Sequence, residues 1–168
     1  MLLRRATLLL VAAAMLAAPV AAWGQSGPTA NPGLLSVLKG KGTVDLQAKG
    51  ALIGGIARGK LKIKILKVKH RRGLPHGQVS IRMLGKGTVR HRPDGTTIYK
   101  GRKIRIRIVN EKFRIQINGV GIHLSAVALG TVSLQASPLA LDPGTFSLNG
   151  ADYQPLPLAL TTYQLASP

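Results

Sequence analysis

Charged and apolar residues alternate one by one in two stretches of this chain. The first stretch is Lys-Leu-Lys-Ile-Lys-Ile at 60–65, and the second is Lys-Ile-Arg-Ile-Arg-Ile at 103–108. Successive side chains of a β-strand point to opposite faces of the sheet, so a period of two places the cations on one face and the apolar residues on the other. The alternation therefore predicts β-strands with a cationic outer face and an apolar inner face.

Segments with strand character recur along the rest of the chain, and glycine and proline separate them. Arg92-Pro-Asp-Gly95 and Asp142-Pro-Gly144 have the composition of β-turns. Many short strands at regular spacing are typical of sandwiches and barrels, so we expect an all-β fold, an antiparallel β-sandwich or barrel of about 10–12 short strands. Residues 103–109 and 112–118 are joined by Asn110-Glu111 and are expected to pair as a hairpin.

A short motif, Gly-Thr-Val, occurs three times, at 42–44, 87–89 and 130–132, with spacings of 45 and 43 residues. The first two copies extend to Gly-Lys-Gly-Thr-Val, and a basic alternating strand follows each of them. One interpretation is a fold built from three repeats of about 45 residues. The other is that the motif is ordinary strand-entry chemistry that recurs by chance, since no basic strand follows the third copy.

The N-terminal residues have the features of a secretory signal peptide. Arg4 and Arg5 form a positive start, residues 6–18 are apolar but shorter than the roughly 20 residues of a membrane span, and small residues allow cleavage after Ala22 or Gly24. We therefore expect a signal peptide at 1–24, a linker at 25–33 and a single all-β domain at 34–168, secreted or otherwise extracytoplasmic, in the cell envelope. An uncleaved N-terminal anchor is the alternative. No later stretch is apolar enough to span a bilayer.

The chain contains no Cys, so disulfides cannot stabilise the exported domain. A domain of this size buries about 68–70% of its unfolded surface, which is enough for a core of its own.

Positive charge is concentrated in the middle of the sequence. Residues 39–114 hold 22 of the 24 Lys and Arg but only three acids, whereas residues 115–168 contain no Lys or Arg. Like charges packed on one sheet face repel one another, which favours a bound anionic partner over a merely solvated surface. The cations predicted to bind it are Lys60, Lys62, Lys64, Lys67, Lys69, Arg71, Arg72, Lys103, Arg105, Arg107, Lys112 and Arg114.

Export narrows the partner to an anionic envelope polymer, such as a teichoic-type phosphate or an acidic polysaccharide, or to an anionic membrane surface. Extracellular nucleic acid is less favoured, because Tyr99 and Phe113 are the only aromatic residues in the basic stretch and offer little for bases to stack on. The other reading is a structural or self-associating envelope protein whose basic face is only solvated. The sequence does not fix the oligomeric state.

No catalytic residue, cofactor or metal is expected. His123 and Ser125 share a strand face, but they have no evident third partner, and we interpret them as a histidine at the edge of the core and a packed serine. The five acids of the mature chain form no evident pair for glycan hydrolysis. His70, His76 and His91 match no standard zinc spacing, and cations surround them. The protein is therefore expected not to be an enzyme.

Overall fold

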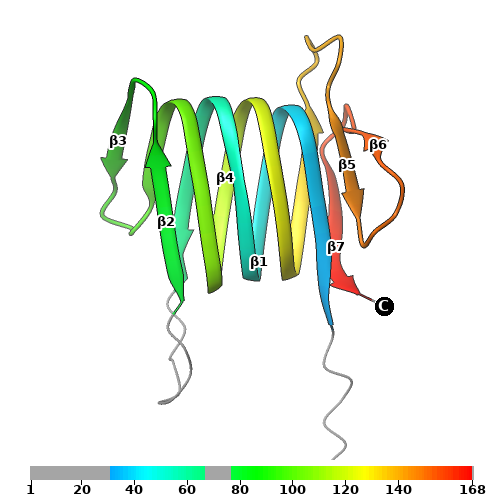
Figure 1. Cartoon of the computed structure of the whole chain (residues 1–168), viewed down its shortest axis with the longest axis horizontal. Helices are drawn as coiled ribbons and strands as arrows, with labels where there is room; N and C mark the ends of the chain where they lie inside the picture. Colours follow the sequence, from blue (N-terminus) through cyan, green and yellow to red (C-terminus); the bar gives the residue numbers. More distant parts are fainter. Residues whose placement is uncertain (1–30, 67–76, 168) are drawn as a thin grey trace, which may run out of the picture.

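The computed structural model describes residues 31–66 and 77–167, and every regular element in these two ranges is a β-strand. Two strands are very long, and five are short (Figure 1). The strands are β1 (Asn31–Ile65), β2 (Gln78–Met83), β3 (Gly87–His91), β4 (Thr97–Ala136), β5 (Thr145–Leu148), β6 (Gln154–Pro155) and β7 (Thr161–Ser167). All pairings between them are antiparallel, and they join the strands into one sheet.

The two long strands wind around each other as a flattened coil (Figure 1). Val44 of β1 lies between Ile117 and Leu134 of β4, which are seventeen residues apart in the sequence. Ile117 in turn lies between Val44 and Leu61 of β1, again seventeen residues apart. Each turn of one strand is thus hydrogen-bonded on both sides to turns of the other, and the strand advances by one turn about every seventeen residues.

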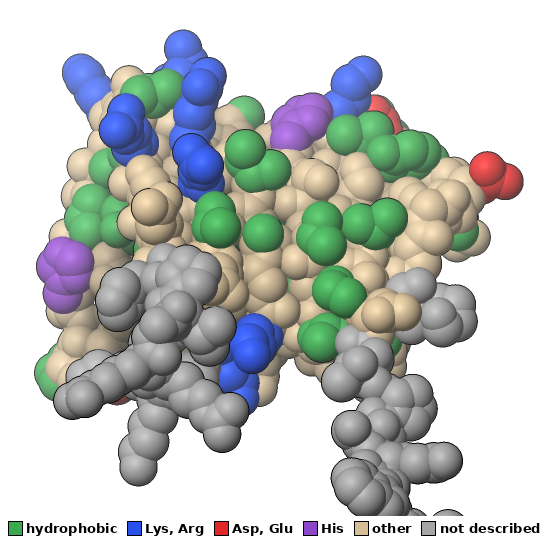
Figure 2. All heavy atoms as spheres, turned by 60° about the horizontal axis from the view of Figure 1, so that its bottom comes forward, with side chains coloured by type: hydrophobic (Ala, Val, Ile, Leu, Met, Phe, Trp, Pro, Cys, Tyr) green, Lys and Arg blue, Asp and Glu red, His purple; other side chains and the backbone are tan. Residues whose placement is uncertain are grey.

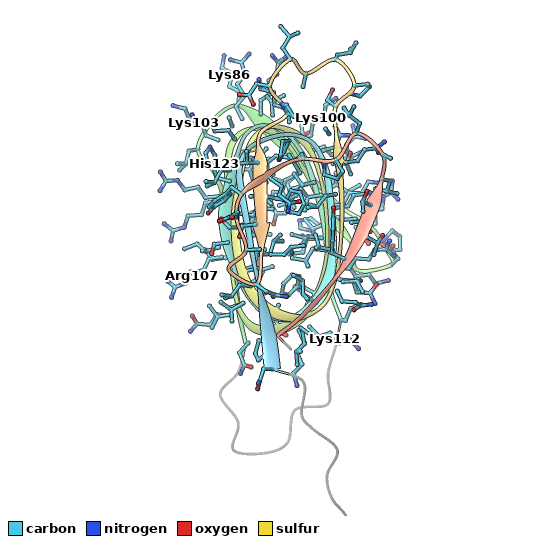
Figure 3. The ribbon with its side chains drawn as sticks, turned by 90° about the vertical axis from the view of Figure 1, so that its right-hand side faces the viewer. Lys86, Lys100, Lys103, Arg107, Lys112 and His123 are labelled. Atoms are coloured by element: carbon cyan, nitrogen blue, oxygen red, sulfur yellow. The ribbon has the colours of Figure 1, made fainter. Side chains whose placement is uncertain are left out.

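The coil has two broad faces that meet at narrow edges, as the view along its axis shows (Figure 3). We call the face that contains β3 and β7 the β3 face; between these strands it holds residues 97–101, 59–63, 115–119, 42–46 and 131–134. We call the other the β2 face; it runs from β2 through residues 104–109, 52–56, 122–127 and 34–38 to β5. Residues with positive φ, such as Lys103 (51°) and Asn110 (54°), lie where β4 passes from one face to the other.

The hydrophobic core lies between the two faces. Alternation along each strand places every second side chain inside. The apolar residues expected to point inward from 103–118 are all at most 2% exposed: Ile104, Ile106, Ile108, Phe113, Ile115 and Ile117. The expectation of an apolar inner face is confirmed.

A row of five glycines crosses the β3 face at one narrow edge: Gly87, Gly101, Gly59, Gly119 and Gly42, each paired with the next. Their positions bring backbones very close together. A Cβ built on Gly119 would lie 3.0 Å from the Cα of Gly59, and one built on Gly101 would lie 2.9 Å from the Cα of Gly87. Glycine at these positions lets successive turns of the coil approach where a side chain would push them apart.

Several expectations about the fold need correction. The chain is all-β, but its sheet is open, and neither the sandwich, the barrel nor the threefold repeat is confirmed. The expected short strands merge into β1 and β4, because Gly50, Gly54, Gly55 and Gly59 continue β1 instead of ending it. β1 also begins at Asn31, so 31–33 of the expected linker lie in the strand. The expected signal peptide at 1–24 and residues 25–30 lie outside the described residues.

The predicted hairpin is wrong. Residues 103–109 pair with β1 and with β2, and residues 112–118 pair with two turns of β1, not with 103–109. Asn110, with φ of 54°, bends the strand around an edge of the coil and does not reverse it.

Candidate polyanion-binding groove

The predicted binding cations do not lie on one face of the molecule. Lys60 and Lys62 belong to the β3 face, and Lys64 and Arg114 lie one residue beyond its border, whereas Arg105 and Arg107 belong to the β2 face. In the view along the coil, Lys103 and Lys112 lie near opposite narrow edges (Figure 3). Lys67, Lys69, Arg71 and Arg72 lie outside the described residues. The single cationic face inferred from alternation is therefore divided by the coil into two.

The cations are concentrated instead toward one end of the coil. Most of the Lys and Arg side chains visible in Figure 2 lie toward the end formed by β2 and β3. The turns nearest to the other end, residues 131–136, β5 and β7, contain no Lys or Arg. We call these two ends the cationic end and the neutral end.

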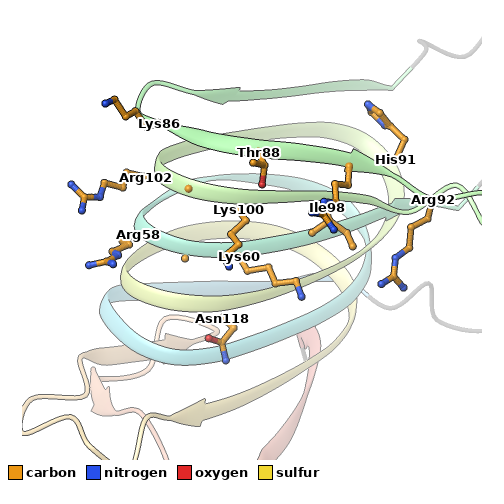
Figure 4. A pocket seen from close by; sticks show the side chains of 13 residues that line it. Arg58, Lys60, Lys86, Thr88, His91, Arg92, Ile98, Lys100, Arg102 and Asn118 are labelled. Carbon is orange, nitrogen blue, oxygen red and sulfur yellow. The ribbon is translucent and has the colours of Figure 1, made fainter.

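A groove of about 970 Å³ lies on the β3 face at the cationic end (Figure 4). Among the described residues, seven Lys and Arg line it, and no Asp or Glu does. These cations are Arg58, Lys60, Lys86, Arg90, Arg92, Lys100 and Arg102. Thr88, His91, Ile98 and Asn118 also line the groove, as does the backbone of Gly59 and Gly101. We refer to it as the basic groove.

Strand pairing forces like charges together in the basic groove. Arg58 is directly opposite Arg102, and Lys60 is directly opposite Lys100. Directly opposite side chains on neighbouring strands are about 4.5–5.5 Å apart at Cβ, and like charges at that separation destabilise a sheet. The arrangement recurs outside the groove in Arg82–Arg105, Lys49–Lys112 and Lys64–Arg114. A bound anion would relieve this repulsion.

Few counter-charges are available within the described residues. The ion pair found there joins Arg114 to Asp45, 3.2 Å apart, and Arg114 is not a groove residue. The nearest acid along the chain is Asp94, in the turn between β3 and β4, and it accepts hydrogen bonds from the backbone N–H and the hydroxyl of Thr96. These bonds, the backbone one first, hold the pKa of Asp94 below its ordinary value. Its carboxylate is thus engaged in the turn.

Of the predicted residues that the structure describes, only Lys60 lines the basic groove. The six other groove cations also lie in the basic stretch. Arg58 is two residues from Lys60, and Arg102 is two residues from Lys100, so each arginine shares a strand face with a groove lysine. This spacing is a local signal from which the two arginines could have been predicted. The grouping of these cations in one groove also depends on which turns of the coil are neighbours. That is set by pairing between residues 40 or more apart in the sequence, such as Arg58 and Arg102, and no local sequence pattern predicts it.

His123 and Ser125 are not packed as the sequence suggested. Both side chains are exposed on the β2 face, because they alternate with the buried Ile122, Leu124 and Ala126. Within the described residues, no three His, Asp or Glu side chains come together as metal ligands. His70 and His76 lie outside those residues.

The part of the chain that the structure describes contains no helix long and apolar enough to span a membrane. Comparison with protein-family models, with curated proteins and with solved structures gives no match, so the function has to be argued from the geometry of the basic groove.

Proposed function

We propose that this is an exported, non-enzymatic protein that binds anionic cell-envelope polymers, and that phosphate-rich polymers bind in the basic groove. The observation that carries the proposal is the set of seven Lys and Arg that line one groove with no acid among them. Export rests on the signal-peptide features of residues 1–24.

The shape of the basic groove suits a chain-like ligand better than a single ion. Its lining residues come from four neighbouring strand segments: β3, 97–102, 58–60 and the segment containing Asn118. Neighbouring strands are about 4.8 Å apart, so the lining extends over about 14 Å and its cations, which lie on three of the four segments, over about 10 Å. A polymer with regularly spaced phosphates can meet several of them at once, and the arginines among them can each hold two phosphate oxygens.

Nucleic acid is a weaker candidate for this site. Phe113 is fully buried, and Tyr99 is half-buried and packed against the core, so neither aromatic residue of the basic stretch is free to stack on a base. A phosphate polymer without bases needs no such platform.

Self-association is the second candidate, and the open sheet favours it. β2 and β3 end the sheet at the cationic end, and exposed leucines such as Leu139, Leu141 and Leu158 lie in the C-terminal connections. Open sheet edges and exposed apolar residues can both pair with another copy. Oligomers that form at high protein concentration and persist at high salt would support this candidate over the first.

The test compares two triple variants of equal charge. The groove variant changes Arg58, Lys100 and Arg102 to Gln, and the control changes Lys39, Lys41 and Lys49, outside the groove, to Gln. Binding of inorganic polyphosphate, anionic vesicles and single-stranded DNA is measured at about 50 and 200 mM salt, where affinity carried by phosphate contacts falls steeply.

The proposal expects tight, salt-dependent binding of polyphosphate to the wild type. Because each phosphate contact contributes about 0.7 to the slope of log K against log salt, the groove variant should lower that slope by about 2. The control variant should change it little. Equal losses in both variants would show that only net charge matters, and tighter binding to vesicles or DNA than to polyphosphate would identify a different ligand.

A further inference from the structure

A second depression, of about 720 Å³, lies on the β2 face and differs in chemistry from the basic groove. Its polar lining includes Arg82, Arg105, Arg107, His123 and several serines. It crosses five strand segments, from β2 to residues 36–38, which corresponds to about 19 Å. We call it the serine–arginine trough.

Two outward-facing rows of side chains form the trough. In the first row, Arg82, Arg105, Gly55 and His123 follow one another across the paired strands. Gly55 has no side chain, so the space between Arg105 and His123 is open. In Figure 3, Arg107 and His123 lie on the same side of the coil.

The second row supplies hydroxyl groups and an apolar surface. Ser80, Arg107, Ile53, Ser125 and Ser36 follow one another in register. Ile53 is 60% exposed, so its apolar side chain is available to a ligand in the trough. At the far end, the hydroxyl of Ser36 is hydrogen-bonded to that of the exposed Tyr153, 2.9 Å away.

The arginines of the trough have no partner in the described part of the chain. No ion pair or side-chain hydrogen bond there involves Arg82, Arg105 or Arg107. Arg82 and Arg105 are also directly opposite each other, so each adds to the repulsion felt by the other.

We propose that the serine–arginine trough binds an acidic polysaccharide whose sugar units carry carboxylates. A guanidinium group matches a carboxylate with two parallel hydrogen bonds, which Arg105 and Arg107 can supply. The hydroxyls of Ser80 and Ser125 are partners for sugar hydroxyls, and the exposed Ile53 is a surface for the apolar face of a sugar ring. A bare phosphate chain can accept hydrogen bonds from the hydroxyls, but it has no apolar face to place on Ile53. This proposal does not depend on phosphate binding in the basic groove.

The test fills the trough without changing its charge. Gly55→Leu suits this purpose because a Cβ at Gly55 meets only the carbonyl oxygen of Ile104, at 3.3 Å, and its φ lies outside the left-handed region. A second variant, Arg105→Gln with Arg107→Gln, removes the charges and keeps the trough open. Galacturonate oligomers are the probe for the full chain, dextran is the neutral control, and polyphosphate reports on the basic groove.

The wild type should bind galacturonate oligomers and not dextran. Each trough variant should weaken that binding about tenfold or more, because Arg105→Gln/Arg107→Gln removes charge-assisted hydrogen bonds and Gly55→Leu blocks the ligand from reaching them. Gly55→Leu should leave polyphosphate binding unchanged, and the triple groove variant should still bind galacturonate.

Three results would overturn the inference. One is wild-type affinity for galacturonate in a Gly55→Leu protein whose circular dichroism and melting temperature match the wild type. Another is loss of galacturonate binding in the groove variant but not in Arg105→Gln/Arg107→Gln, which remains informative if Gly55→Leu does not fold. The third is a wild type that binds no galacturonate.

Discussion

Individual glycines in this protein have different tasks, although the sequence presents them all alike. Gly95 lies in the turn between β3 and β4, and a Cβ there would have nothing within 4 Å. Gly42 lies inside β1, where a Cβ would overlap the carbonyl oxygen of Gln135 on the next turn of the coil. In the sequence both resemble the glycines that separate strands, because only the close approach of a distant strand distinguishes them.

The structure predicts a large difference between alanine substitutions at these two glycines. Both have positive φ, 146° at Gly42 and 80° at Gly95, so alanine is strained at either position. Gly95→Ala should cost about 1–2 kcal/mol of unfolding free energy from backbone strain. Gly42→Ala should cost about 3 kcal/mol or more, since steric overlap adds to the strain. Urea denaturation measures both, and equal losses would contradict the close packing of the coil.

Asp94 gives a prediction about pH. Because hydrogen bonds from Thr96 lower its folded pKa below the ordinary value of 3.8, its ionised form stabilises the turn. A lowered folded pKa contributes stability that is present above about pH 4 and is lost as pH falls through the folded pKa. NMR titration should place the pKa of this carboxyl below 3.8. Hydrogen exchange should show that the Thr96 amide is less protected in acid, where Asp94 is protonated. Asp94→Asn should remove the pH dependence of that protection, and an unshifted pKa would contradict the turn geometry.

The strands show what alternation can and cannot predict. The inward side chains of 103–118 follow from a period of two, since the choice of face is a local property of an extended chain. Two other predictions from alternation are wrong: the hairpin at Asn110, and the grouping of Lys60 with Arg105 on one face. Each depends on which distant segment of the chain lies alongside, and alternation does not contain that information. Lys60 pairs with Lys100 and Asn118, forty and more residues away, and no local pattern contains that information.

Opposed lysines on neighbouring strand segments are predicted to reduce stability in the absence of a ligand. Lys100→Glu replaces the repulsive Lys60–Lys100 pair with an attractive one, which should raise the unfolding free energy by about 0.2–1 kcal/mol. The gain should shrink at high salt, where exposed charges are screened. Lys100→Gln, which only removes the repulsion, should give a smaller gain.

Urea denaturation at low and high salt measures these gains, and the same variants should bind polyphosphate more weakly than the wild type. A Lys100→Glu protein that is less stable than the wild type at low salt would show that the pairing of these lysines has been misassigned.

The molecule as a whole is a coil with an apolar core, and most of the cations visible in Figure 2 lie toward one end of it. The all-β class, the apolar interior and the basic character of residues 39–114 can be derived from the sequence. The coil itself cannot be derived from the sequence. Glycines usually mark the ends of strands, but here they lie inside the long strands and allow neighbouring turns to approach one another. Coiling also separates the predicted cations, so that Lys60 lines the basic groove on one side and Arg105 and Arg107 line the serine–arginine trough on the other.

Locating bound polyphosphate on the protein tests directly whether the basic groove is the binding site. Amide chemical-shift changes in an isotope-labelled sample, at low salt, report which residues the ligand approaches. We predict that the shifts concentrate on the lining of the basic groove, around Gly59, Lys100 and Arg102, and leave Lys39 and Lys41 unchanged. Shifts spread evenly over all exposed cations, or no shifts, would contradict a dedicated polyanion-binding groove.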